Sequence, residues 1–143
     1  MATPDLPDGY SLRAGPPPAD DYLALRELTG LSPCTREQAE LGVAGEWHAV
    51  HVVHETSGVT VGMGRVIGDG GWYFHVTDMA VLPDHQRRGI GAAVLTRLVD
   101  RIETAAPLGA YITLLADAPG RPLYRSHGFV ETAPDSIGMV LRR

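Results

Sequence analysis

One segment has the composition of an anion-binding turn. Gln86-Arg87-Arg88-Gly89-Ile90-Gly91-Ala92 joins a predicted strand to a predicted helix. The first amides of a helix lack partners within the helix and lie at the positive end of its dipole, so this position favours an anion. Two glycines allow close approach of the backbone, and two arginines suit a pyrophosphate better than a lone carboxylate.

The same segment could also be an ordinary tight turn, a dinucleotide-binding fingerprint or a P-loop. An isolated Gly-x-Gly also occurs in ordinary tight turns, so the surrounding pattern must decide. The dinucleotide-binding fingerprint does not fit, because Val94 stands where its third glycine is needed. The P-loop does not fit either, because no Gly-Lys-Ser/Thr follows.

The strand before this turn contains an irregular position. Its apolar side chains fall first at Phe74 and Val76 and then at Met79 and Val81, so the alternation changes near Thr77-Asp78. A β-bulge is the simplest explanation. Such a bulge splays a parallel neighbour away and leaves backbone groups available to an extended ligand.

These residues form part of a recognisable signature. The segment 76–91, VTDMAVLPDHQRRGIG, resembles the acetyl-CoA signature of the GNAT superfamily of N-acetyltransferases. Further on, LYRSHGF at 123–129 resembles its second signature, L-Y-x-x-x-G-F. The two stretches stand in the expected order and separation, and the order of predicted elements is similar from Tyr10 to Leu141.

The resemblance implies acetyl-CoA as co-substrate and assigns a role to individual residues. Tyr124 would protonate the departing CoA thiolate; its alternative is a packed aromatic with a bonded hydroxyl. Asp117 stands where members often carry an asparagine that contacts the cofactor arm, and a carboxylate there can accept but not donate a hydrogen bond. The pantetheine arm would pair with Met79, Ala80 and Val81, and the pyrophosphate would bind the amides of Gln86, Arg87, Arg88, Gly89, Ile90, Gly91 and Ala92.

The proton acceptor has more than one candidate. An amine must be neutral to attack a thioester, so a carboxylate, an imidazole or a water chain has to take its proton. Asp78 beside the predicted bulge is the first candidate and His75 the second. Both also have structural interpretations: Asp78 as an acceptor for amides at the bulge, and His75 as a hydrogen-bonded histidine of the sheet.

Three histidines and one cysteine could in principle bind a metal or act as a nucleophile, but their pattern predicts neither. His48 and His54 point to one side of a strand and His51 to the other, which disfavours a shared metal, and we expect no metal site. Cys34 has no adjacent histidine or lysine, so we expect a small buried residue instead of an acetyl-cysteine nucleophile.

The elements that must position these residues follow from the pattern. We expect a strand at Tyr10–Arg13, a helix capped by Asp20 and ended by Gly30, and a helix opened by a Thr35/Gln38 capping box. Three antiparallel strands follow, at His48–Glu55, Val59–Ile67 and Trp72–Leu82.

The remaining elements complete a mixed sheet. An amphipathic helix begins at Gly89, and Ala110–Ala116 predicts a buried strand parallel to its predecessor. A short helix spans Pro122–His127, and Phe129-Val130 and Ile137–Leu141 could supply two closing strands. The fold class is therefore α/β (α+β mixed), with a mixed, mostly antiparallel sheet and flanking helices in a GNAT-like arrangement.

Size and charge limit the function classes. A chain of 143 residues with a single cysteine suits one disulfide-free domain, residues 1–143, in a reducing compartment. A net charge of −5 argues against nucleic acid as a partner. The start Met1–Gly9 has no signal-peptide pattern and no stretch is long enough for a membrane span, so we expect a cytoplasmic protein without membrane contact.

These observations predict an N-acetyltransferase that acts by direct attack in a ternary complex on a primary amine of a small molecule. The acceptor would lie against Leu28–Glu46 and the Arg65–Trp72 turn. Two alternatives stay open: a CoA-binding sensor without catalysis, in which Tyr124 is dispensable, and acetylation of a protein N-terminus or lysine. A homodimer also stays open.

Overall fold

The computed structural model describes residues 6–143, so the beginning of the segment in which we found no signal peptide lies outside the described residues. A five-stranded sheet has the order β1-β2-β3-β4-β5. Its first three neighbour pairs are antiparallel, and β4 and β5 are parallel, as predicted. The strands are β1 (Tyr10–Ala14), β2 (His48–His54), β3 (Val59–Gly68), β4 (Tyr73–Val81) and β5 (Tyr111–Leu114).

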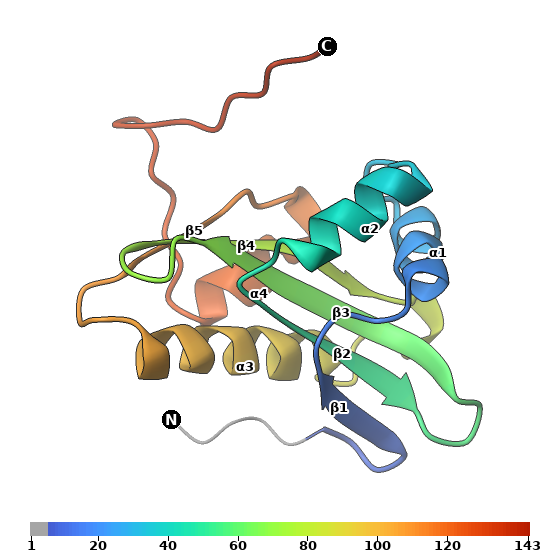
Figure 1. Ribbon diagram of the computed structural model, residues 1–143. Coiled ribbons are helices and arrows are strands. Elements are labelled where there is room, and N and C mark those ends of the chain that lie inside the picture. Colours follow the sequence, from blue (N-terminus) through green and yellow to red (C-terminus); the bar gives the residue numbers. More distant parts are fainter. Residues whose placement is uncertain (1–5) are drawn as a thin grey trace.

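Helices cover both faces of the sheet (Figure 1). On one side lie α1 (Ala19–Thr29) and α2 (Arg36–Ala44), and on the other lie α3 (Ile90–Ala105) and α4 (Arg121–Ser126). Two 3₁₀ turns, η1 (Pro83–His85) and η2 (Ala118–Gly120), precede α3 and α4. The predicted fold class is confirmed.

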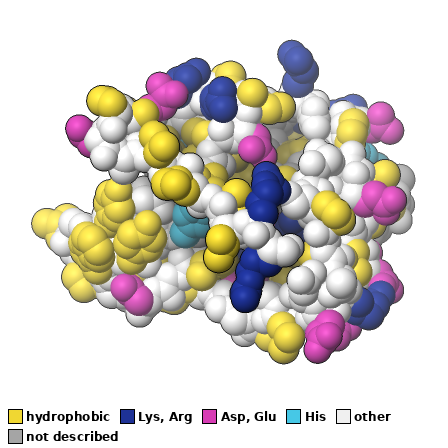
Figure 2. Space-filling model, turned by 90° about the horizontal axis from the view of Figure 1, so that it is seen from above, with side chains coloured by type: hydrophobic (Ala, Val, Ile, Leu, Met, Phe, Trp, Pro, Cys, Tyr) yellow, Lys and Arg dark blue, Asp and Glu magenta, His cyan; other side chains and the backbone are white. Residues whose placement is uncertain are grey.

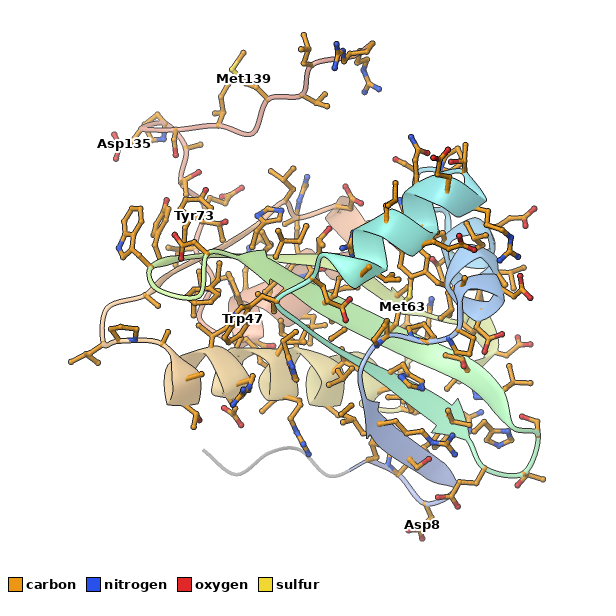
Figure 3. The ribbon with its side chains drawn as sticks, viewed as in Figure 1. Asp8, Trp47, Met63, Tyr73, Asp135 and Met139 are labelled. Carbon is orange, nitrogen blue, oxygen red and sulfur yellow. The ribbon has the colours of Figure 1, made fainter. Side chains whose placement is uncertain are left out.

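The core has two parts, one on each face. The larger lies under α3, where Val94, Leu95, Leu98 and Ile102 pack against the valines of β2 and β3 and against Phe74. The smaller lies under α1 and α2 and includes Tyr22, Leu25 and Met63, with Met63 reaching up from the sheet in Figure 3. The amphipathic pattern of α3 therefore fixes which side of the sheet it covers.

One of the two predicted helix N-caps is confirmed and the other is wrong. Thr35 and Gln38 form both bonds of the capping box that opens α2. The assignment of Asp20 as a cap was wrong: α1 is capped by Pro18, whose carbonyl accepts from Tyr22 N–H at 2.9 Å. Because α1 starts one residue before Asp20, this carboxylate lies in the first turn, where it pairs with Arg36.

The C-terminal strands were predicted wrongly. Neither Phe129-Val130 nor Ile137–Leu141 forms a strand, because the chain after α4 runs past β5 and away from the sheet (Figure 1). The strand predicted at Ala110–Ala116 is shortened to β5, and it is half-buried instead of buried, with Tyr111 exposed. No strand among residues 6–143 covers its outer edge.

Candidate active site

The predicted anion-binding turn lies between η1 and α3. Arg87 has φ 62° and Gly89 has φ 82°, left-handed conformations of the kind found in loops whose successive amides bind an anion. The first backbone bond of α3 runs from Ala93 N–H to Gly89 O at 3.0 Å. The amides at the start of α3 are therefore left for a ligand. The predicted amide of Gln86 is not, because it donates to Pro83 O at 3.3 Å. The side chains of Gln86, Arg87 and Arg88 are exposed around them.

The predicted bulge in β4 is present. Arg65 pairs with Thr77 and Met63 pairs with Ala80, so β4 has one extra residue opposite Gly64. Asp78 occupies this position with φ 56°, a left-handed conformation that is uncommon outside glycine. Parallel pairing with β5 stops before it, at Val76 and Leu114.

The two strands thus separate beside the anion-binding turn. Met79, Ala80 and Val81 continue β4 beyond its last pair with β5, which leaves one edge of their backbone without a strand partner among residues 6–143. Gln86 Nε2 donates to Val81 O at 2.9 Å and links this edge to the turn. An extended chain with an anionic end fits this arrangement: its body against β4 and its anion at α3.

The two signatures meet at this place. A Cβ on Gly91 would lie 3.4 Å from Leu123 of α4 and 3.8 Å from Val81 of β4. Tyr124 is the next residue of α4, is half-buried, and lies edge-on to Phe129 at 6.2 Å between ring centroids. Burial raises the pKa of the Tyr124 phenol, and the nearby charge of Asp117 raises it further. The phenol is therefore protonated at neutral pH and able to donate.

Asp78 is the centre of a charge network. Its side chain is 9% exposed, and its two oxygens lie 2.6 Å from Arg26 and 2.6 Å from Arg65. Tyr22 donates a third bond to the same carboxylate. Burial raises the pKa of Asp78, but the bonds from Tyr22 and Arg65 and the charges of the two arginines outweigh it, so the net pKa lies below its usual value.

His75 has very different surroundings. It lies on β4 between Ile67 of β3 and Thr113 of β5, and its Nδ1 is 3.0 Å from the Thr113 hydroxyl. Burial lowers the pKa of His75 below its usual value. The imidazole is therefore neutral at neutral pH, the form in which it accepts a proton.

The sequence analysis assigned no individual role to four residues of this region, although Glu46 and Arg65 are end residues of the two segments that it proposed for the acceptor. Arg26, Arg65 and Tyr22 surround Asp78, and Arg65 also donates to Gly42 O of α2 at 3.0 Å. The fourth, Glu46, follows α2; its buried Oε2 has no hydrogen-bond partner among residues 6–143, and burial raises its pKa although Arg65 lowers it. The partners of Asp78 lie 13 to 56 residues away from it in the sequence, so no local motif could have indicated them.

Three other histidines, His48, His51 and His54, lie on β2, and Cys34 precedes α2. His51 Nδ1 lies 2.9 Å from Gly15 O and His54 Nδ1 lies 2.8 Å from Ser57, whereas the pKa of His48 is lowered by burial and by two arginines of α3. No cluster of three or more metal-ligating side chains occurs within residues 6–143. Cys34 is half-buried, not buried as expected, and packs against the smaller core.

Comparison with known proteins identifies the family. Residues 46–131 match the model of the acetyltransferase (GNAT) domain, which is more than half of the chain. A probable acetyltransferase from methicillin-resistant Staphylococcus aureus has a solved structure that is 36% identical over 94% of this chain and 99% of its own, with a TM-score of 0.88. The chain belongs to the GNAT acetyltransferase family, whose members use acetyl-CoA as co-substrate.

Two more distant structures share the fold. A GNAT-family acetyltransferase from Streptococcus pneumoniae is 23% identical over 94% of this chain and 98% of its own, with a TM-score of 0.74. Glucosamine-6-phosphate N-acetyltransferase from Arabidopsis thaliana is 19% identical over 93% and 97%, with a TM-score of 0.68. No curated protein sequence matches the chain.

The helices give no indication of a membrane span. In the part of the chain that the structure describes, none is both long enough and apolar enough to cross a bilayer.

Proposed function

We propose that this protein transfers the acetyl group of acetyl-CoA to the primary amine of a small molecule by direct attack in a ternary complex. The observation that carries the proposal is the separation of β4 from β5 next to the amides at the start of α3, which make no backbone bond within the helix. Acetyl-CoA supplies the acetyl group as a thioester, and CoA leaves as a thiolate. The chain's own residues bind the two substrates and move the protons.

In this proposal the turn binds the pyrophosphate. The amides of residues 87–92 provide donors at the positive end of α3, and Arg87 and Arg88 add charge. Met79, Ala80 and Val81 bind the pantetheine arm along the unpaired edge of β4, and Asp117 lies near its end. Tyr124 is the proton donor for the thiolate, since its phenol stays protonated near neutral pH.

We infer that His75 takes the proton of the amine. Asp78 was the first candidate, but both of its oxygens are bound to arginines and its pKa is lowered, which makes it a weak base. Asp78 then serves as the anchor that holds the bulge, the alternative role that the sequence left open. His75 is neutral, half-buried and on the same bulged strand.

The acceptor is proposed to bind between α2 and the exposed part of β4. Glu46 places a buried carboxylate oxygen without a partner near Arg65, at the end of the Leu28–Glu46 region. Such a group is suited to bind a second ammonium or hydroxyl of the acceptor. Figure 2 looks down on this side of the molecule and shows charged side chains gathered at its middle.

A thiol-release assay tests the proposal. Acetyl-CoA is combined with a panel of small primary amines and, separately, with peptides that offer an N-terminus or a lysine. We expect turnover with small amines, and a KM that rises in Glu46→Gln for those with a second polar group. Turnover with the peptides and with no small amine would show that the acceptor is a protein N-terminus or lysine. Binding of acetyl-CoA without turnover of any amine would show that the protein is a sensor.

A further inference from the structure

The outer edge of β5 is an open strand edge. β5 pairs with β4 on one side, from Tyr73 and Tyr111 to Val76 and Leu114, and with no strand among residues 6–143 on the other. Beside its start, Trp72, Tyr73 and Tyr111 form an exposed aromatic group in which Trp72 and Tyr111 stack at 5.5 Å. Hydrophobic side chains gather at this end of the molecule in Figure 2. Native sheets rarely leave such an edge uncovered.

The C-terminal segment, residues 129–143, has the pattern of the missing partner. The run Ile137-Gly138-Met139-Val140-Leu141 has no polar side chain, and in an extended chain Ile137, Met139 and Leu141 share one face. These three side chains are 68%, 87% and 82% exposed. Figure 3 shows Met139 well apart from the folded body. An apolar strand pattern held in water indicates a surface that another element covers.

A groove separates this segment from the sheet. It measures about 1070 Å³ and is lined on one side by β5 and α4 and on the other by residues of the C-terminal segment. Within one chain the two sides approach at Gly138, where an added Cβ would lie 2.7 Å from Leu115. The remainder of the segment is directed away from β5, so the edge needs a strand from elsewhere (Figure 1).

We propose that the C-terminal segment of a second copy of this chain pairs with β5, and that the two copies exchange these segments about a two-fold axis. Each copy then gains a partner for its open edge and buries its exposed apolar residues. Charge permits this contact: the segment has two acidic and two basic side chains, Glu131, Asp135, Arg142 and Arg143, and is neutral although the chain carries −5.

Molar mass by light scattering after size exclusion is the first test. We expect wild type to have twice the 15.3 kDa chain mass over a wide concentration range. The double variant Ile137→Asp/Leu141→Asp should fall to the single-chain mass and keep the helical signal of its circular dichroism spectrum, which shows that the rest of the chain is folded. Leu28→Asp, an equally drastic change at an exposed leucine of α1, should remain dimeric. A monomeric wild type, or a double variant that stays dimeric, would overturn the proposal.

A cross-linking experiment distinguishes exchange of the C-terminal segments between two chains from pairing of each segment with its own sheet. It does not need the aspartate variants. In a Cys34→Ser background, chains with Tyr111→Cys and chains with Val140→Cys are refolded together and treated with a short bis-maleimide. Exchange predicts a covalent pair formed from one chain of each kind, and no pair when Leu28→Cys replaces Tyr111→Cys. A cross-link formed within a single chain that carries both cysteines, and none in the mixture, would show that each segment closes its own sheet.

Discussion

Tyr124 tests the proposed proton donor at the scale of a single residue. Tyr124→Phe keeps the ring that packs edge-on to Phe129 and removes the hydroxyl alone. We expect kcat to fall roughly 10²-fold, because one general acid is lost, with little change in acetyl-CoA affinity. Steady-state kinetics and a binding titration measure the two effects. A Phe variant as fast as wild type would remove Tyr124 from the mechanism and favour its packing role.

His75 tests the proposed proton acceptor. Its pKa is lowered, so kcat/KM should fall on the acidic side below about 6.5, the usual pKa of histidine, as the imidazole gains a proton. His75→Gln should remove that acidic limb and lower the plateau by roughly 10²-fold. His48→Gln is a matched control, because burial also lowers the pKa of His48 but its neighbours are Arg97 and Arg101 of α3. An acidic limb that survives in His75→Gln would return the role to Asp78 or to water.

At the scale of an element, the bulge of β4 is predicted to depend on the charge of Asp78. Asp78→Asn removes the charge that faces Arg26 and Arg65, whose side chains are 13% and 15% exposed, so two largely buried cations lose their charged partner. We expect a loss of about 3–5 kcal/mol in the free energy of unfolding. Urea denaturation measures it, and Asp20→Asn, which breaks the exposed pair with Arg36, should change stability little.

The sign of the pH dependence follows from the same residue. The folded pKa of Asp78 is lowered, so its contribution to stability is present above the unfolded value of about 3.9 and is lost as the pH falls through the folded pKa. The Asn variant should lack this part of the acid dependence. Equal stability of wild type and variant at pH 7 would contradict the anchoring role.

The elements show what periodicity can and cannot predict. The change of alternation between Val76 and Met79 located the bulge, because side-chain direction in a strand has a fixed period of two. The partners of Asp78 were not predictable, because Arg26 and Tyr22 come from a helix far away in sequence. The pattern of Ile137–Leu141 predicted a strand that the structure does not form, since a strand forms only where the edge of a sheet receives it.

At the scale of the whole molecule, local signals again predict some features and tertiary packing decides the others. The order of elements, the parallel β4–β5 pair and the turn before α3 follow from local signals such as capping, glycine and apolar spacing. The acceptor side depends on how α1 and α2 lie over β3 and β4, and Glu46 and Arg65 meet there through tertiary packing. Sequence therefore indicated the cofactor side of the proposed site in more detail than its acceptor side.

The most direct test of the account is a calorimetric titration of acetyl-CoA into wild type and Gly91→Val. Gly91 lies in the first turn of α3 between Val81 and Leu123, so a larger side chain should crowd the proposed pyrophosphate site. Gly71→Val, in the turn between β3 and β4, is the control for adding the same side chain elsewhere. We predict binding to wild type and to the control, and affinity at least about tenfold weaker for a folded Gly91→Val, a difference of about 1.4 kcal/mol. Unchanged affinity in that folded variant would contradict the assignment of this turn as the acetyl-CoA site.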